Sequence, residues 1–268
     1  MLTEKPILWA AILVVVLAAG GGYFYYYRTH QSAAAPPPAE QVHLPPPAPP
    51  ETGIQHPVPQ AASSAEAAAP LPALNDSDQS FRDALVMVPG AAPIEKILVP
   101  QSLIRHIVAT VDNLPRKKVA LELRPIKSTS GQMVTAGDAD QVTLSPQNEA
   151  RYAPFVELVK STDTKQLVAL YFRFYPLFQQ AFEDLGFPGQ YFNDRVIQVI
   201  DNLLATPDVK GPIELTQPNV LFLYADPKLE ALSAGQKTLL RMGPDDERVL
   251  KEKLRQLREA LATHKNPK

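Results

Sequence analysis

The feature that most constrains the fold is an aromatic-rich helical pattern between Thr164 and Leu185. Apolar residues recur there every three or four positions, in two adjacent stripes. The stripes are Val168, Tyr171, Tyr175, Phe178, Phe182 and Leu185, and, one position earlier, Leu167, Leu170, Phe174, Leu177 and Ala181. Such a face is wider than a coiled-coil seam, as a helix central to a globular core requires. Nine of the 20 aromatic residues lie between Tyr171 and Phe192, so we expect the hydrophobic centre there.

Local signals set the limits of this helix and of the next one. Asp163, followed three residues later by Gln166, predicts an N-terminal capping box. Pro176 predicts a kink and not a break, because the apolar stripes continue in phase past it. Asn193 is expected to cap a second helix, which Pro207 stops.

The rest of the region after residue 75 carries mostly helical signals. Further helices are expected over residues 77–88, 101–113, 154–160, 233–242 and 244–261. Residues 132–135 and 141–144 flank a Gly- and Asp-containing turn, which predicts a β-hairpin, and residues 119–123 are expected to add a short strand. The predicted fold class is therefore mainly α: a helical-bundle-like domain with a small β-hairpin, preceded by a transmembrane helix and a linker.

The distribution of proline predicts the domain organisation. Twelve of the 28 prolines lie between Gln31 and Asn75, in a segment rich in Ala. Such a segment cannot build a core and is expected to act as a semi-rigid spacer. The prediction is a tail and membrane anchor over residues 1–30, a disordered Pro/Ala-rich linker over residues 31–75 and a mainly helical globular domain over residues 76–264. Three histidines in or beside the linker are expected to be solvated: His30, His43 and His56.

The segment from Ile7 to Tyr27 is the predicted membrane span. It carries no charged residue over 21 positions, close to the ~20 residues that a helix needs to cross a bilayer. Aromatic residues lie near both of its ends, as membrane interfaces favour. A cleaved signal peptide is the alternative, but it would have a weak positive region and would leave five aromatic residues at a new N-terminus. We therefore expect a single-pass signal anchor in a bacterial inner membrane, with the C-terminal domain in the periplasm.

Charge and composition exclude several classes of function. After Asn75 the chain has 24 basic and 24 acidic residues, without the basic excess typical of nucleic-acid binding. The absence of cysteine excludes disulfides, thiol catalysis and cysteine-ligated zinc. His106 is the one histidine between the linker and the C-terminal tail, and no glycine-rich phosphate loop is present. No cofactor, metal site or catalytic residue is predicted, and an enzymatic role is not favoured.

Two sets of residues remain as weak candidate sites. Asp112, Asp194 and Asp201 could serve acid–base chemistry, although helix caps and solvated faces explain them more simply. The turn that carries Phe187, Pro188, Gln190 and Tyr191 is the candidate interaction surface. The alternative is that its two aromatic side chains only close the core.

Short motifs after the linker resemble those of a known family. They are VATVDNLPR (108–116), YPLF (175–178), GFP (186–188), YFNDR (191–195), DNLL (201–204), YADP (224–227), LSAGQK (232–237) and RMGP (241–244). In this combination the chain resembles the proteobacterial, membrane-anchored domain-of-unknown-function family DUF3014. The resemblance implies an N-terminal span and a proline-rich tether, and it implies no activity or functional residues.

The layout favours a membrane-tethered periplasmic interaction module. A long spacer gives a tethered binder a high effective concentration over a wide reach. The expected partners are the inner membrane, through the N-terminal helix, and an envelope protein or peptidoglycan-associated partner, with no nucleic acid. The alternative function is a carboxylate-dependent envelope enzyme or a small-ligand sensor domain.

Overall fold

The structure, a computed structural model, describes residues 54–58, 70–127, 133–138 and 141–262. The predicted span from Ile7 to Tyr27 and most of the predicted linker lie outside these residues. The α-helices are α2 (Asp78–Val86), α3 (Leu103–Asn113), α4 (Glu149–Ser161), α5 (Thr164–Asp184), α6 (Phe192–Leu204), α7 (Pro227–Glu230), α8 (Ala234–Met242) and α9 (Pro244–Ala262). The 3-10 helices are η2 (Leu74–Asp76), η3 (Ala92–Lys96), η4 (Leu121–Leu123) and η5 (Pro146–Asn148). The strands are β1 (Thr135–Ala136), β2 (Thr143–Leu144), β3 (Leu215–Thr216) and β4 (Leu223–Tyr224).

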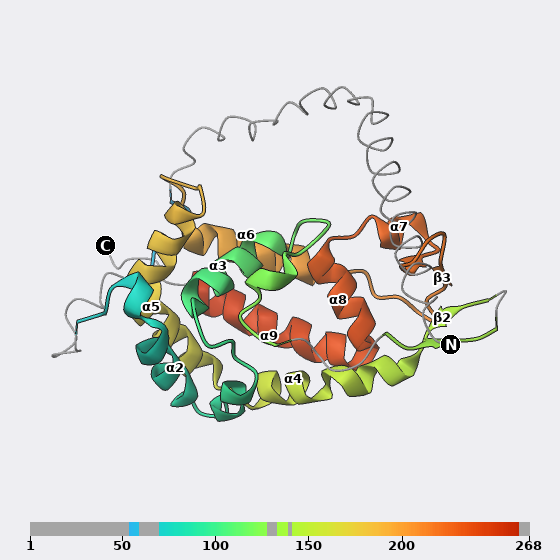
Figure 1. The fold of residues 1–268 in the computed structure, drawn as a ribbon, viewed down its shortest axis with the longest axis horizontal. Helices are drawn as coiled ribbons and strands as arrows, with labels where there is room; N and C mark the ends of the chain where they lie inside the picture. Colours follow the sequence, from blue (N-terminus) through green and yellow to red (C-terminus); the bar gives the residue numbers. More distant parts are fainter. Residues whose placement is uncertain (1–53, 59–69, 128–132, 139–140, 263–268) are drawn as a thin grey trace, which may run out of the picture. The chain divides into compact units, whose positions relative to one another are not determined.

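This part of the chain is mainly helical, as predicted, with two small antiparallel hairpins (Figure 1). β1 and β2 pair with Thr135 opposite Leu144, which confirms the predicted hairpin over a shorter length. β3 and β4 form a second hairpin, with Leu215 opposite Tyr224, that the sequence did not predict. Among the described residues, no helix combines the length and the apolar character needed to cross a membrane.

The main core forms around α5, where α2, α3 and α6 meet it. Three phenylalanine rings are almost completely buried there: Phe174 is 0% exposed, and Phe182 and Phe192 are 1% exposed. Phe81 of α2 packs edge-on against Phe174, with ring centroids 5.2 Å apart. Each such ring removes roughly 150–250 Å² from water, so the aromatic cluster that the sequence predicts is the centre of this core. Two residues of the predicted stripes are outside it. Val168 is buried in a second cluster, with Ile197, Ile200 and Leu261, and Leu185 follows the end of α5 and is 40% exposed.

Proline interrupts neither of the helices that contain it. α5 continues through Pro176, and α4 continues through Pro154, where the sequence predicted that a helix begins. Both prolines are exposed, so water can hydrate the backbone of the preceding turn. The strand predicted over residues 119–123 is also wrong, because the chain forms the 3-10 helix η4 there.

The last helix, α9, contacts α4, α5, α6 and α8 (Figure 1). Leu250 and Leu261 are buried, at 7% and 5% exposure. Leu254 and Leu257 of the same stripe are partly buried against α5 and α6 residues. The leucine stripe of α9 therefore packs on its own domain.

Candidate functional site: a bound strap at the start of α6

A short segment of the predicted linker lies against the N-terminal end of α6. We call residues 54–58, with the sequence Ile-Gln-His-Pro-Val, the strap. Its main chain is hydrogen-bonded by three side chains, which we call the strap site: Tyr191, Asn193 and Asp194. The strap is separated from these residues by more than 130 positions in the sequence, so only the tertiary fold brings them together.

Asp194, in the first turn of α6, accepts three hydrogen bonds from the strap. Its Oδ2 accepts from the backbone N–H of Gln55 at 3.0 Å, and its Oδ1 accepts from the backbone N–H of His56 at 2.8 Å. Oδ1 also lies 2.9 Å from His56 Nδ1. Because a carboxylate accepts and does not donate, Nδ1 of His56 must carry a proton. The Asp194 side chain is 15% exposed, so these charge-assisted hydrogen bonds are partly shielded from water.

Asn193 binds the strap carbonyl from a fully buried position. Its exposure is 0%, and its Nδ2 donates to the carbonyl oxygen of His56 at 2.9 Å. Its Oδ1 accepts from the hydroxyl of Tyr171 at 3.2 Å. Burial raises the pKa of Tyr171 well above its ordinary value, so the hydroxyl stays protonated and remains a donor. Tyr171 therefore orients the Asn193 amide so that its nitrogen points at the strap.

Side chains of α5 cap α6, and the predicted cap at Asn193 is wrong. The N–H of Phe192 donates to Gln179 Oε1 at 2.9 Å, and the N–H of Asn193 donates to the Tyr175 hydroxyl at 3.3 Å. The first N–H groups of a helix have no partner within the helix, and here the neighbouring helix supplies one. The Asn193 side chain is therefore not used as a cap and is available to the strap.

Tyr191 joins the strap to the aromatic core. Its hydroxyl accepts from the backbone N–H of Val58 at 2.7 Å. Its ring centroid lies 5.4 Å from that of Tyr175. The side chain of Val58 packs against the same core cluster, at partial burial. The strap site thus combines polar contacts to main chain with one apolar contact.

Comparison with known families covers the helices that build this site. A family model described as "Protein of unknown function (DUF3014)" matches residues 103–258. The chain belongs to the DUF3014 family. No curated protein and no solved structure matches it. The strap site lies within the matched residues, and the strap precedes them.

In the predicted interaction surface of the DUF3014 domain, one aromatic residue belongs to the core and the other belongs to the strap site. The ring of Phe187 stacks on Phe182 at 4.6 Å, with an interplanar angle of 16°, so Phe187 closes the core. Pro188 and Gln190 are exposed. Tyr191 binds the strap, and so only this aromatic residue of the turn has a contact that the core does not require.

Each of the three candidate carboxylates has its own partners. Asp112 is 2% exposed and is bound by Arg195 at 3.0 Å and by Arg116 at 2.5 Å. Asp201 is paired with Arg258 through hydrogen bonds of 2.5 and 3.1 Å. The third carboxylate belongs to the strap site. Within the described ranges, no group of three or more His, Asp or Glu residues is placed to hold a metal ion.

Sequence reasoning missed the role of His56. A solvated histidine was predicted, and this is wrong, because the His56 side chain is 25% exposed and bonded to Asp194. The strap has a weak local signal: two aliphatic residues, Ile54 and Val58, among Pro and polar residues. Aliphatic residues also occur elsewhere in the linker, at Val42 and Leu44, so this signal could not single out the strap.

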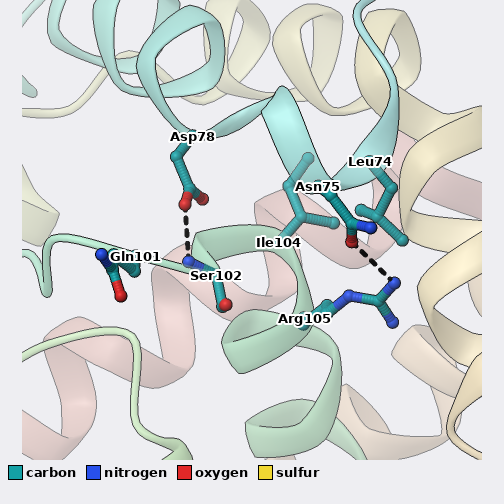
Figure 2. Close-up of a pocket in the computed structure, with 7 residues that line it drawn as sticks. All are labelled: Leu74, Asn75, Asp78, Gln101, Ser102, Ile104 and Arg105. Carbon is teal, nitrogen blue, oxygen red and sulfur yellow. Dashed lines mark hydrogen bonds between the residues drawn. The ribbon is translucent and has the colours of Figure 1, made fainter.

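A hollow lies between α2 and α3 (Figure 2). Asp78 points across it and caps α3, accepting from the N–H groups of Ser102 at 2.6 Å and Leu103 at 2.7 Å. Arg105, on its far side, is bound to Asn75 at 3.1 Å and to Asp184 at 2.8 Å. Its charged groups thus hold η2, α2, α3 and α5 together, which explains them without a ligand.

Proposed function

We propose that this DUF3014 protein is a tethered interaction module whose strap site binds a short, bent peptide segment. The observation that carries the proposal is the strap itself: five hydrogen bonds hold residues 55–58 on the strap site. Four of the five involve main-chain groups of the strap. The strap is bent at Gln55 and His56, so that two consecutive N–H groups reach one carboxylate. A surface that binds main chain in this way accepts a short segment in the same bent conformation.

The predicted layout of the chain supports a tethered role. The segment from Ile7 to Tyr27 is proposed as a single-pass inner-membrane anchor, with the domain in the periplasm. The proposed partner is an envelope protein, or one associated with peptidoglycan. A spacer between anchor and binding domain raises the effective concentration of the domain within its reach.

The partners of the three carboxylates favour binding over catalysis. Asp112 and Asp201 each have an arginine partner, and Asp194 has the strap. A carboxylate pair for acid–base chemistry needs two such groups near one substrate. This arrangement supports the interaction module rather than a carboxylate-dependent enzyme.

Photocrosslinking in intact cells tests the proposal. A photoreactive amino acid at Gln190, which is exposed beside Tyr191, is expected to capture a specific envelope protein. The matched control is the same residue at Gln256, an exposed position on α9. Recovery of the same proteins from both positions, or of none from Gln190, would count against the proposal.

A reporter fused after Lys268 tests the topology separately. Alkaline phosphatase at this position is expected to be active, because it needs the oxidising periplasm to form its disulfides. A fluorescent reporter that folds only in the cytoplasm serves as the control and is expected to stay dark. The opposite pattern would place the domain in the cytoplasm.

A further inference from the structure

We infer that the strap is an exchangeable internal ligand, and that the partner presents a segment of the same chemistry: a peptide that bends in the same way and has His, then Pro, then an aliphatic residue. The inference rests on the proposed function and names the partner class of the same site. It follows from which main-chain and side-chain groups of the strap are bound, and from the small number of contacts that the described residues make with it.

The pattern of main-chain groups is the first element of recognition. Two consecutive N–H groups, those of Gln55 and His56, are bound by one carboxylate, that of Asp194. Proline lacks this donor, so it is excluded from both positions. The next residue is Pro57, for whose nitrogen no acceptor is needed. The N–H after it, that of Val58, is bound by the Tyr191 hydroxyl.

Two side chains supply the second element. The His56 ring donates through Nδ1 to Asp194, and a residue without a donor at that position would leave one carboxylate contact unmade. Val58 packs against the core cluster that includes Tyr175 and Tyr191. A charged residue there would be desolvated without a partner, which is costly. Ile54 is 60% exposed and adds little selectivity.

Among the described residues, five hydrogen bonds and the packing of Val58 hold the strap, few enough that exchange is feasible. Only His56, Pro57 and Val58 are partly buried, and the first two strap residues are exposed. Such a short segment binds weakly on its own, because ordering each residue costs roughly 1–2 kcal/mol. It gains occupancy because only the 11 residues 59–69 separate it from Pro70, which places it at an effective concentration of the order of millimolar.

Release of the strap would also lengthen the tether. The part of the chain between the predicted span and the bound strap, residues 28–53, is 26 residues long. With the strap released, residues 28–69 form a tether of 42 residues. At ~3.1 Å per residue, the maximum reach rises from about 80 Å to about 130 Å. A domain whose strap has been displaced by a partner could therefore reach farther from the proposed anchor.

A peptide-binding experiment on the full chain tests the inference. The probe is a fluorescein-labelled peptide with the sequence of residues 51–62, ETGIQHPVPQAA, and the readout is fluorescence anisotropy. The proteins are the detergent-solubilised wild type and a released variant with His56→Ala and Val58→Asp. We expect the probe to bind the released variant at least tenfold more tightly than the wild type, whose own strap competes.

Variants of the site show where the probe binds. In the released variant, Asp194→Ala is expected to weaken binding of the probe at least tenfold. The matched control, Asp201→Ala, removes an aspartate from the same helix that bonds to Arg258 and not to the strap, and is expected to leave binding unchanged. Tyr191→Phe removes only the hydroxyl that binds Val58 and is expected to weaken binding severalfold. This variant keeps the ring that packs on Tyr175, so the test does not depend on whether Asp194→Ala folds.

The outcomes separate this inference from the proposed function. Binding of the probe to neither protein, or equally to both, would overturn the inference and make the strap a permanent part of the fold. A specific crosslink from Gln190 would in that case still support a tethered interaction module, with its partner bound beside the strap and not in the strap site. Loss of binding when His or Val of the probe is replaced by Ala would support the partner class. An unchanged affinity would overturn it.

Discussion

The salt bridge between Asp112 and Arg195 offers a direct test of how α6, the helix that carries Asn193 and Asp194, is held on α3. Arg195 of α6 donates through Nε to Asp112 Oδ1 at 3.0 Å and through Nη2 to the carbonyl oxygen of Asp112 at 3.0 Å. That carbonyl belongs to the last turn of α3, where helical carbonyls lack helical partners. Replacing Arg195 by methionine keeps much of the apolar stem and removes both contacts. The buried carboxylate of Asp112 then keeps its hydrogen bond from Arg116, which lies four residues later in the sequence.

The expected magnitude follows from burial. The Asp112 side chain is 3% exposed and the Arg195 side chain 26% exposed. Breaking a buried pair on one side costs about 3–5 kcal/mol, and the remaining contact to Arg116 reduces this, so we expect about 2–3 kcal/mol. The exposed pair of Arg258 with Asp201 is the matched control, with side chains 42% and 48% exposed. Arg258→Met is expected to cost less than about 1 kcal/mol.

Thermal unfolding of the full chain, followed by circular dichroism, measures the difference. For a domain of this size each kcal/mol lowers Tm by about 2–4 °C, so Arg195→Met is expected to lower Tm by roughly 5–10 °C. Adding Asp112→Asn to this variant should restore part of the loss, because it removes the uncompensated charge. Equal effects of Arg195→Met and Arg258→Met would refute the argument from burial.

Two further predictions concern a tight turn and the loss of stability at acidic pH. Gly90→Ala is expected to destabilise the domain by about 2–4 kcal/mol, because Gly90 has φ +80° and a Cβ there would lie 1.8 Å from the Ser161 carbonyl oxygen. Gly211→Ala, at φ +88° with nothing within 4 Å, should cost only about 1–2 kcal/mol in denaturant titrations. Burial raises the pKa of Glu230, but its hydrogen bonds, chiefly from Lys237, outweigh burial and leave the pKa below the ordinary 4.5. This contribution is complete above pH 4.5 and is lost as the pH falls through the lowered value, so Lys237→Met should flatten the pH dependence of stability measured between about pH 3 and 6; an unchanged slope would contradict this.

Local sequence signals predicted the elements whose causes are local. The capping residue Asp163 accepts from the N–H of Gln166 at 2.8 Å. The Ser233 capping box at the start of α8 is complete, and Pro244 is the first residue of α9. These features depend on residues within one turn of each other, so the order of residues alone specifies them.

One error arose where a neighbour in space replaces a local partner, and two others where the local signal was incomplete or too short. Asn is a residue type that often caps helices, so Asn193 was predicted as the N-cap of α6. Instead, the side chains of Gln179 and Tyr175 of α5 accept hydrogen bonds from the first N–H groups of α6. Pro154 was expected to begin a helix, but α4 had already begun at Glu149. The β3–β4 hairpin has strands of two residues each, too short for an alternating pattern to identify.

The sequence by itself determined the helical class, the aromatic core around α5 and the membership of the DUF3014 family. Helical periodicity and burial of aromatic rings act over a few residues and leave a visible pattern. Only the tertiary structure decided the strap site, because its contacts join positions 133 to 139 apart and most of them bind main-chain atoms. Every residue but proline has the same main-chain donor and acceptor. The pairing of the strap with Asp194 therefore leaves little trace in the residue types, and it depends on where the fold places α6.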